Sequence, residues 1–241
     1  RALEGQARHY TMSWPDHEHE ACRPLRRSPL YDRLSQKQAC FGVKSGWERA
    51  NWFASEGQEA RYIYDWGKQN WFENHRKEHL SVREKAGLFD MTSFGKIRVD
   101  GKDSCKFLQY VCCSDVDVSP GRIIYTQMLN KKGGIECDLT VTRLSEESYL
   151  LVVPGATLQR DLSWLKRHRN NFSVSIIDFT AAEAVLVLMG PNSRKILEKM
   201  LEEEEIHGQE AKDHGSEELP PPVKGMMTAT SKIMTTLSRY F

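Results

Sequence analysis

The chain has 241 residues, of which 39% are hydrophobic, and a formal net charge of +1 at pH 7. This near-neutral balance gives no electrostatic argument for a nucleic-acid partner or an anionic membrane, and no run approaches the roughly 20 apolar residues that span a bilayer. The length accommodates one large domain or two small ones.

The first 27 residues, which begin at Arg1 without a signal or transit peptide, carry many charges and aromatic rings but no clear period. We interpret this start as that of a processed protein or an internal fragment. His17 and His19 could suggest metal ligands, but on a helix they would point to different faces, so a solvated polar loop is favoured. The six cysteines form no Cys-x-x-Cys pair, which favours reduced thiols in an intracellular compartment.

Residues 28–75 combine short elements with bulky rings. Residues 28–34 predict a turn that enters a helix, and residues 38–44 predict a strand. Four of the six tryptophans lie between Trp47 and Trp71, a clustering typical of rings that fill a core or a domain seam, with a ligand-stacking role as the alternative. Residues 54–75 lack strong periodicity, so we expect a long irregular connection.

The next elements are predicted as a helix at 74–86 ended by Gly87, a strand at 88–99, and a helix at 103–113. The last helix would place Cys105, Leu108, Val111 and Cys112 on one face. Asp90 lies among apolar neighbours in the predicted strand. It is either an acid placed to meet a ligand or a side-chain cap for a nearby backbone turn.

The stretch from Gly121 to Leu144 predicts two strands around a turn at 131–134, where glycines supply positive φ. In the first strand, Tyr125 faces one side and Met128 the other; residues 135–142 then alternate apolar and polar. Asp138 is unusual, because Asp is disfavoured in strand interiors and is costly to bury unpaired. It is either solvated or placed to meet a ligand.

The remaining chain predicts strands at 149–153, 173–179 and 184–189, a helix at 156–168, and a last helix that opens at 190–193. This mixture of helices and long hairpins indicates an α+β fold rather than a doubly wound parallel sheet. Residues 202–241 are acidic and Pro-rich, so we expect a disordered tail, with a weak helix possible at 226–238.

Flavin- and nucleotide-binding fingerprints are absent, since no Gly-x-Gly-x-x-Gly precedes a helix and no phosphate loop occurs. Several segments do carry a family likeness. In order they are residues 28–34, 46–47, 86–92, 125–130, 133–139 and 190–192. Together they resemble the folate-binding aminomethyltransferase (glycine cleavage T-protein-like) fold, and in particular the C-terminal half of the mitochondrial sarcosine and dimethylglycine dehydrogenases. The likeness covers roughly residues 10–200.

This resemblance implies tetrahydrofolate as a cofactor that accepts a one-carbon unit released from an N-methyl amino acid. It places Asp138 near the accepting folate nitrogens and makes Asp90 a second candidate, for proton transfer or for shaping the pocket. Tyr125 and Met128 would line the folate cavity, with plain core packing as the alternative. FAD is implied only for a full-length protein, so this chain is not expected to be catalytically complete by itself.

The resemblance also implies boundaries and a location. Residues 1–27 would be a remnant of a preceding FAD-dependent oxidoreductase domain, and 28–75 a central linking segment of the oxidoreductase or the start of the T-protein-like fold. Residues 76–201 would be the N-terminal part of the folate-binding domain, and 202–241 the tail. The compartment would be the mitochondrial matrix. Two further interpretations stay open. One is a non-catalytic regulatory protein like the pyruvate dehydrogenase phosphatase regulatory subunit, which shares residues 21–26 and 28–34 well. The other is a non-functional truncated product.

Overall fold

The structure is a computed structural model that describes residues 2–12, 14–15 and 17–200. It divides into two compact units. Among the described residues, the first unit joins those up to Gln69 to Asp90–Leu186, and the second joins Asn70–Phe89 to residues 187–200. None of the helices in the described ranges is both long and apolar enough to cross a membrane.

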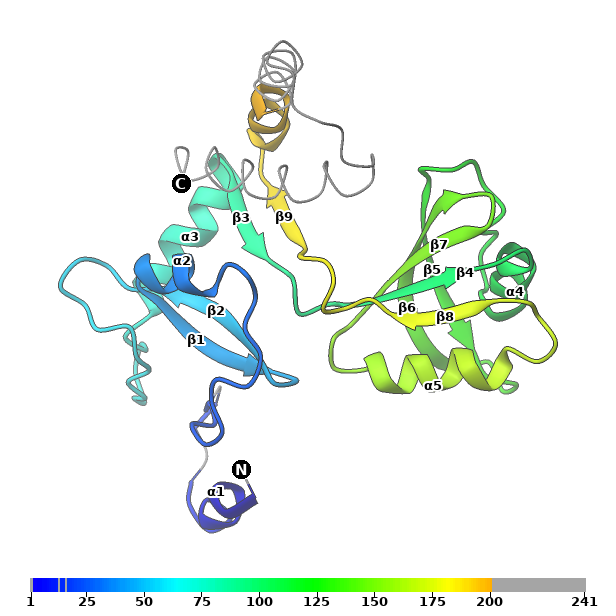
Figure 1. Ribbon diagram of the computed structural model, residues 1–241. Coiled ribbons are helices and arrows are strands. Elements are labelled where there is room, and N and C mark those ends of the chain that lie inside the picture. Colours follow the sequence, from blue (N-terminus) through cyan, green and yellow to red (C-terminus); the bar gives the residue numbers. More distant parts are fainter. Residues whose placement is uncertain (1, 13, 16, 201–241) are drawn as a thin grey trace, which may run out of the picture. The chain divides into compact units, whose positions relative to one another are not determined.

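The N-terminal part of the first unit contains two short helices and a two-stranded sheet (Figure 1). The helices are α1 (Ala2–Ala7) and α2 (Tyr31–Gln36), and the strands are β1 (Ala39–Lys44) and β2 (Trp47–Phe53), which pair antiparallel. The strand predicted at 38–44 is therefore confirmed, whereas β2 was not foreseen. Gly46 has a φ of +85° in the turn between the strands, a conformation that glycine adopts without strain.

Three of the four clustered tryptophans are buried, as predicted. Trp47 and Trp52 project from β2, and Trp71 precedes the first helix of the second unit. Trp66 differs, because it is 79% exposed and lies against Trp14, with ring centroids 5.0 Å apart. Residues 54–71 form no helix or strand, which confirms most of the predicted irregular connection.

The rest of the first unit is a five-stranded sheet with the order β5-β6-β7-β4-β8, in which every neighbouring pair is antiparallel. Two helices accompany the sheet (Figure 1). The bounds are β4 (Gly95–Asp100), α4 (Ser104–Val111), β5 (Ile123–Leu129), β6 (Ile135–Ser145), β7 (Ser148–Val153), α5 (Leu158–His168) and β8 (Ser175–Asp178). These elements confirm the predicted α+β class.

One hydrophobic core joins this sheet to both helices. Alternate residues of β6 and β7 face inward, because successive side chains of a strand point to opposite faces. The helices contribute Phe107, Leu108 and Val111 from α4, and Leu158, Leu162 and Leu165 from α5. The predicted apolar face of α4 was partly wrong. Phe107 is fully buried, while Cys105 and Cys112 are only partly buried at the margin of the core.

The single strand predicted at 88–99 is wrong, since the structure has β3 (Gly87–Asp90) and β4 separated by a turn. Asp90 causes the interruption by accepting a hydrogen bond from the Thr92 amide at 3.0 Å. The Phe94 amide then donates to the Met91 carbonyl, which closes the turn. Short polar side chains commonly bond to a backbone amide two residues on and so compete with a strand.

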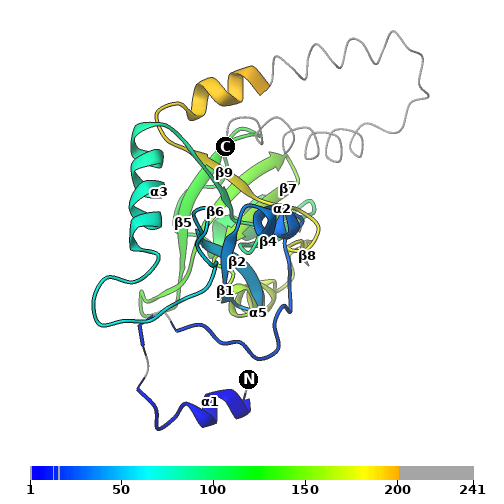
Figure 2. The ribbon, with the colours of Figure 1, turned by 90° about the vertical axis from the view of Figure 1, so that its left-hand side faces the viewer.

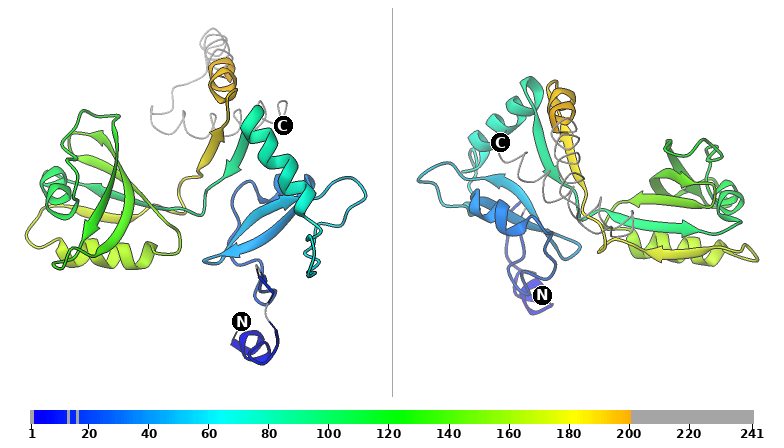
Figure 3. Two further views of the ribbon diagram at one scale, coloured as in Figure 1. Left: turned by 180° about the vertical axis from the view of Figure 1, so that it is seen from behind. Right: turned by 45° about the horizontal axis from the view of Figure 1, so that its top comes forward.

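The second unit contains α3 (Phe72–Glu84), β3, β9 (Leu186–Met189) and a helix at residues 193–200. Strands β3 and β9 pair, and they lie side by side in both views of Figure 3. Figure 2 shows α3 and the C-terminal helix of this unit. The Asn192 amide donates to the Lys85 carbonyl at 2.9 Å and so attaches the start of the last helix to the end of α3. The predicted tail at 202–241 lies outside the described residues.

The hairpin between β5 and β6 depends on Asn130. Its side-chain oxygen accepts from the amides of Lys132 and Gly134, at 2.9 and 3.0 Å. Its side-chain nitrogen donates to Glu136 at 2.9 Å. Gly133 has a φ of +78°, so only one of the two glycines supplies the positive φ that the sequence predicted for the turn. Asn130 thus fixes the turn that sets the register of the hairpin.

We expect Asn130→Ala to lower the free energy of unfolding by about 1–2 kcal/mol, because two turn amides lose their acceptor. The measurement is urea denaturation followed by circular dichroism. Lys131→Ala, in the same exposed turn, is the matched control and should change stability by less than about 0.5 kcal/mol. Equal effects of the two variants would contradict the role of Asn130.

Candidate functional site

Asp138 lies on β6, an interior strand of the sheet, and its side chain is on the exposed face. Its neighbours Cys137 and Leu139 point the other way, into the core. Asp138 pairs in register with Gln127 of β5, and Tyr125 pairs with Thr140 two residues along. Because the carboxylate is exposed, the burial penalty that made an acid in this strand unusual does not arise.

Tyr125 and Asp138 interact directly across the two strands. They are diagonal neighbours on one face, a spacing that long side chains bridge. The Asp138 carboxylate raises the pKa of Tyr125, because the neutral phenol can donate a hydrogen bond to it and the phenolate cannot. A hydrogen bond from Gln127 acts in the opposite direction. The face therefore carries a connected polar group of a phenol, an amide and a carboxylate.

Apolar side chains surround this polar group. Ile123 and Ile135 are 64% and 66% exposed, and Leu129 is also exposed. Tyr125 adds the ring of a side chain that is 63% exposed. An exposed apolar area around a few convergent polar groups is the pattern of a ligand-contacting surface. The arrangement suits a flat heterocycle that presents N–H groups to a carboxylate.

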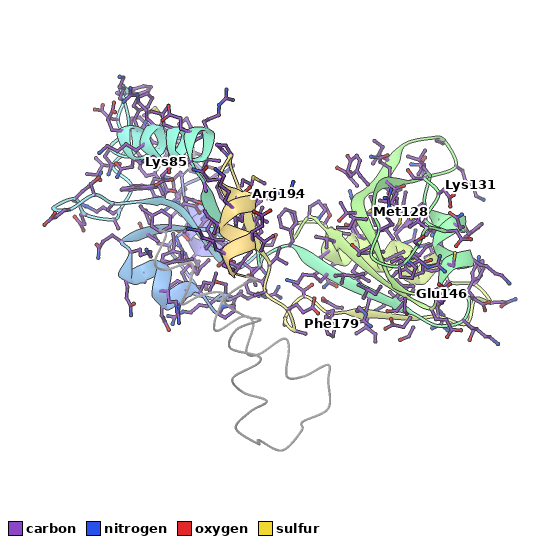
Figure 4. All side chains as sticks on the ribbon, turned by 90° about the horizontal axis from the view of Figure 1, so that it is seen from above. Lys85, Met128, Lys131, Glu146, Phe179 and Arg194 are labelled. Atoms are coloured by element: carbon purple, nitrogen blue, oxygen red, sulfur yellow. The ribbon has the colours of Figure 1, made fainter. Side chains whose placement is uncertain are left out.

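Met128 does not lie on this face. It projects from the opposite side of β5, is fully buried, and belongs to the core shared with α4 and α5. Figure 4 shows it inside this body, whereas Lys131 lies at the margin. The expectation that Met128 lines a cavity together with Tyr125 is corrected on this point. Strand alternation separates the two side chains, and Met128 packs the core.

Asp90 is held by local contacts apart from the Asp138 face. One carboxylate oxygen accepts from the Thr92 amide, and the other accepts from the hydroxyl of Ser28, which is itself buried. The Ser28 oxygen also accepts from the Leu30 amide at 3.2 Å. No contact joins Asp90 to Asp138 among the interactions found in the described residues. Asp90 therefore ties the start of α2 to the end of β3.

Asp161 is a supporting residue that the sequence analysis missed. It lies in the first turn of α5, is 1% exposed, and accepts from the Thr157 hydroxyl at 2.6 Å. Asp161 also acts on the thiol of Cys137, the residue before Asp138 in the chain. Burial raises the pKa of Cys137, and the charge of Asp161 raises it further. This contact fixes β6 against α5. The sequence did contain a pattern that could have identified Asp161, because a Thr lies four residues before it at the start of a predicted helix.

The pKa of Tyr125 supplies a direct test of this geometry. In the folded chain it lies above the ordinary tyrosine value, so the neutral phenol persists to higher pH, and the associated stability is lost as pH rises through the folded pKa. Asp138→Ala should lower the Tyr125 pKa toward the ordinary value. Carbon-13 NMR of ring-labelled tyrosine measures this shift. Tyr10, which is 95% exposed, serves as the internal reference. An unchanged Tyr125 titration would contradict the contact.

Metal binding finds no support in residues 2–12, 14–15 and 17–200, where no group of three or more His, Cys, Asp or Glu is placed to hold an ion. The site is therefore built from one carboxylate, one phenol and one amide on an exposed sheet face with apolar surroundings.

Comparisons with known proteins agree with this architecture. A family model described as the GCVT N-terminal domain matches residues 30–219. The chain is 40% identical over 204 residues to 4-methylaminobutanoate oxidase (formaldehyde-forming) of Paenarthrobacter nicotinovorans, covering 85% of this chain and 25% of that protein. It is 31% identical over 207 residues to mitochondrial dimethylglycine dehydrogenase of Homo sapiens, covering 85% of this chain and 24% of that protein.

A solved structure is also similar. The glycine cleavage system aminomethyltransferase T of Bartonella henselae matches with a TM-score of 0.59 and 28% identity, over 73% of this chain and 44% of that one. The chain spans about a quarter of the length of the oxidase and of the dehydrogenase. It belongs to the GCVT N-terminal domain family and has the glycine cleavage T-protein-like fold that its sequence motifs indicate.

Proposed function

We propose that these residues are the folate-binding portion of a longer FAD-dependent N-methyl amino acid dehydrogenase or oxidase. Their part of the reaction is to capture the released one-carbon unit on tetrahydrofolate. The observation that carries the proposal is the Asp138 carboxylate, which lies diagonally across from Tyr125 on an exposed face of β5 and β6 with exposed apolar side chains around it.

The residues present fit tetrahydrofolate in kind. A carboxylate accepts hydrogen bonds from the N–H groups of a reduced pterin, and an aromatic ring packs against a flat heterocycle. Tetrahydrofolate supplies the nucleophilic amines that accept the one-carbon unit. Asp138 orients such an amine, takes up its proton and stabilises nearby positive charge. Tyr125 holds Asp138 in place. Asp90 is kept as a second candidate, for proton transfer or for shaping the pocket.

The oxidative half of the reaction is assigned to a longer protein. The two relatives are named as an oxidase of 4-methylaminobutanoate and a dehydrogenase of dimethylglycine, so the proposed substrate is an N-methyl amino acid. FAD would be held by another part of that protein, with 1–27 as a remnant of the FAD-dependent domain, 28–75 as a linking segment that includes the start of the T-protein-like fold, and 76–201 as the N-terminal part of the folate-binding domain. The names of these relatives favour the enzyme lineage over a regulatory subunit.

We extend the proposal to a mitochondrial location, in the matrix, because dimethylglycine dehydrogenases of human, rat and mouse are named as mitochondrial. Fractionation of source cells with a matrix marker would test this location. Recovery of the polypeptide only outside the organelle would contradict it.

The proposal predicts that the source polypeptide binds 5-formyltetrahydrofolate, a stable analogue, and that Tyr125→Ala weakens this binding by up to about tenfold, the loss of one aromatic contact. Isothermal titration calorimetry measures the affinity. The matched control is Tyr110→Ala, because Tyr110 is 58% exposed but lies on α4 rather than on the β5–β6 face. Equal affinities for the wild-type protein and the Tyr125 variant would remove Tyr125 from the site.

A further inference from the structure

A second candidate site lies in the N-terminal part of the first unit, within residues 17–64. It is a hollow of about 470 Å³, a size typical of small-molecule sites. The lining residues come from the segment 17–24, from Tyr31, from β1 and Glu48 of β2, and from residues 60–64. Asp138 does not line it, so a ligand bound in this hollow would be independent of the proposed folate chemistry.

Aromatic rings line this hollow in stacked pairs. The rings of Tyr62 and Tyr64 are nearly parallel with centroids 5.8 Å apart, and His17 lies on Tyr64 at 5.0 Å. Tyr31 and Phe41 stack separately at 4.4 Å. Stacking covers the face that each ring turns to its partner, so the walls offer ring edges and the outer faces of the stacks to a bound molecule.

The charge of the lining is negative. Three carboxylates, from Glu18, Glu20 and Glu48, face two guanidinium groups. The charge of Glu48 is neutralised by Arg23, which donates hydrogen bonds to both carboxylate oxygens at 3.0 and 2.6 Å. The other guanidinium, that of Arg61, pairs with Glu59, which does not line the hollow. The carboxylates of Glu18 and Glu20 therefore give the hollow an excess of negative charge.

The Glu18 carboxylate is held in a built position rather than on a free surface. It accepts from the Val43 amide at 2.9 Å and from the Asn51 side chain at 3.2 Å, and both donors are neutral. The absence of a side chain at Gly42 makes space for this carboxylate, since a Cβ at that position would lie 2.2 Å from a Glu18 carboxylate oxygen. Neutral donors orient the carboxylate without cancelling its charge.

We propose that this hollow binds an organic ammonium cation with methylated nitrogen. Methyl groups on the nitrogen remove its hydrogen-bond donors and spread its charge, so the aromatic faces attract it through their quadrupoles. The Glu18 and Glu20 carboxylates compensate the charge over a longer range. A flat anionic ligand would find the same rings but would be repelled by these carboxylates.

Tetramethylammonium chloride is the probe, titrated into the nitrogen-15-labelled chain and followed by NMR. We expect saturable shifts of amides in residues 17–24 and 39–48. We expect affinity to fall at least fivefold in Tyr64→Leu and about threefold in Glu20→Gln, while neutral tert-butanol should bind at least tenfold more weakly. The matched controls, Tyr10→Leu and Glu56→Gln, change exposed residues outside the hollow and should bind as wild type.

The proposal is overturned if tetramethylammonium gives no saturable shifts, if tert-butanol binds equally well, or if the two test variants bind like their controls. Glu20 is exposed, so Glu20→Gln keeps the test decisive even if Tyr64→Leu fails to fold. The folate measurements depend on β5 and β6 instead. The failure of the cation-site proposal can therefore be distinguished from the failure of the folate-site proposal.

Discussion

Replacing Asp138 with Asn in the source polypeptide is expected to reduce folate-coupled turnover by about 100-fold or more, the range of a lost general acid–base or charge-stabilising group. Flavin reduction by the amine should stay unchanged, because that step is assigned to a different part of the protein. The substitution retains the size of the side chain and its exposed position on β6. The measurement compares anaerobic flavin reduction with the tetrahydrofolate-dependent formation of one-carbon product.

Glu136→Gln is the matched control for this experiment. Glu136 lies two residues away on the same strand and the same face, and it bonds to Asn130 in the turn. It should leave the coupling within about twofold of wild type, as expected for a surface change outside the reacting group. Normal coupling in the Asp138 variant, or an equal loss in both variants, would remove Asp138 from the reaction.

Phe107→Ala is expected to lower the free energy of unfolding by about 3–5 kcal/mol, because it empties a large volume in the core. Phe107 is fully buried and packs with Phe172 at a centroid distance of 5.7 Å. Tyr110→Ala, three residues later on α4 and largely exposed, should cost no more than about 1.5 kcal/mol. Urea denaturation of both variants measures the difference. Similar losses would show that α4 does not pack on the sheet through Phe107.

The hairpin was predictable because its chemistry is local. Alternation with period two over residues 123–128 and 135–142 predicted the two strands β5 and β6, and the alternate residues Cys137, Leu139 and Val141 of β6 are the buried ones. The helix predicted at 156–168 is α5, and its Leu158, Leu162 and Leu165, spaced by four and three residues, are buried. In these elements the pattern of burial follows directly from secondary-structure geometry.

Other features depended on residues that are distant in the sequence. Strand β2 lacks a simple alternation because Glu48 is buried, and its partner Arg23 lies 25 residues earlier. The break between β3 and β4 depends on Asp90, whose hydroxyl partner Ser28 lies 62 residues away. A single strand at 88–99 was the natural prediction from local composition. The Asp90 contact with the Thr92 amide forms a turn instead, and the distant contact with Ser28 holds Asp90 in that position.

The candidate site was predictable in part. The sequence singled out Asp138 and Tyr125, but their hydrogen bond depends on the register of β5 against β6, which a turn at Asn130 sets. The thioether of Met128 suits contact with a flat ligand, but its side chain projects from the buried side of β5 into the core. Asp161 was missed because its contact with Cys137 forms between a helix and a strand.

The central claim is that the exposed face of β5 and β6 contacts reduced folate. Hydrogen–deuterium exchange on the source polypeptide, with and without saturating 5-formyltetrahydrofolate, tests this claim most directly. We predict slower exchange in peptides covering residues 123–129 and 135–145, and smaller changes in β1 and β2. Unchanged exchange in both peptides, with protection confined to other parts of the protein, would contradict the assignment of the folate site to this face.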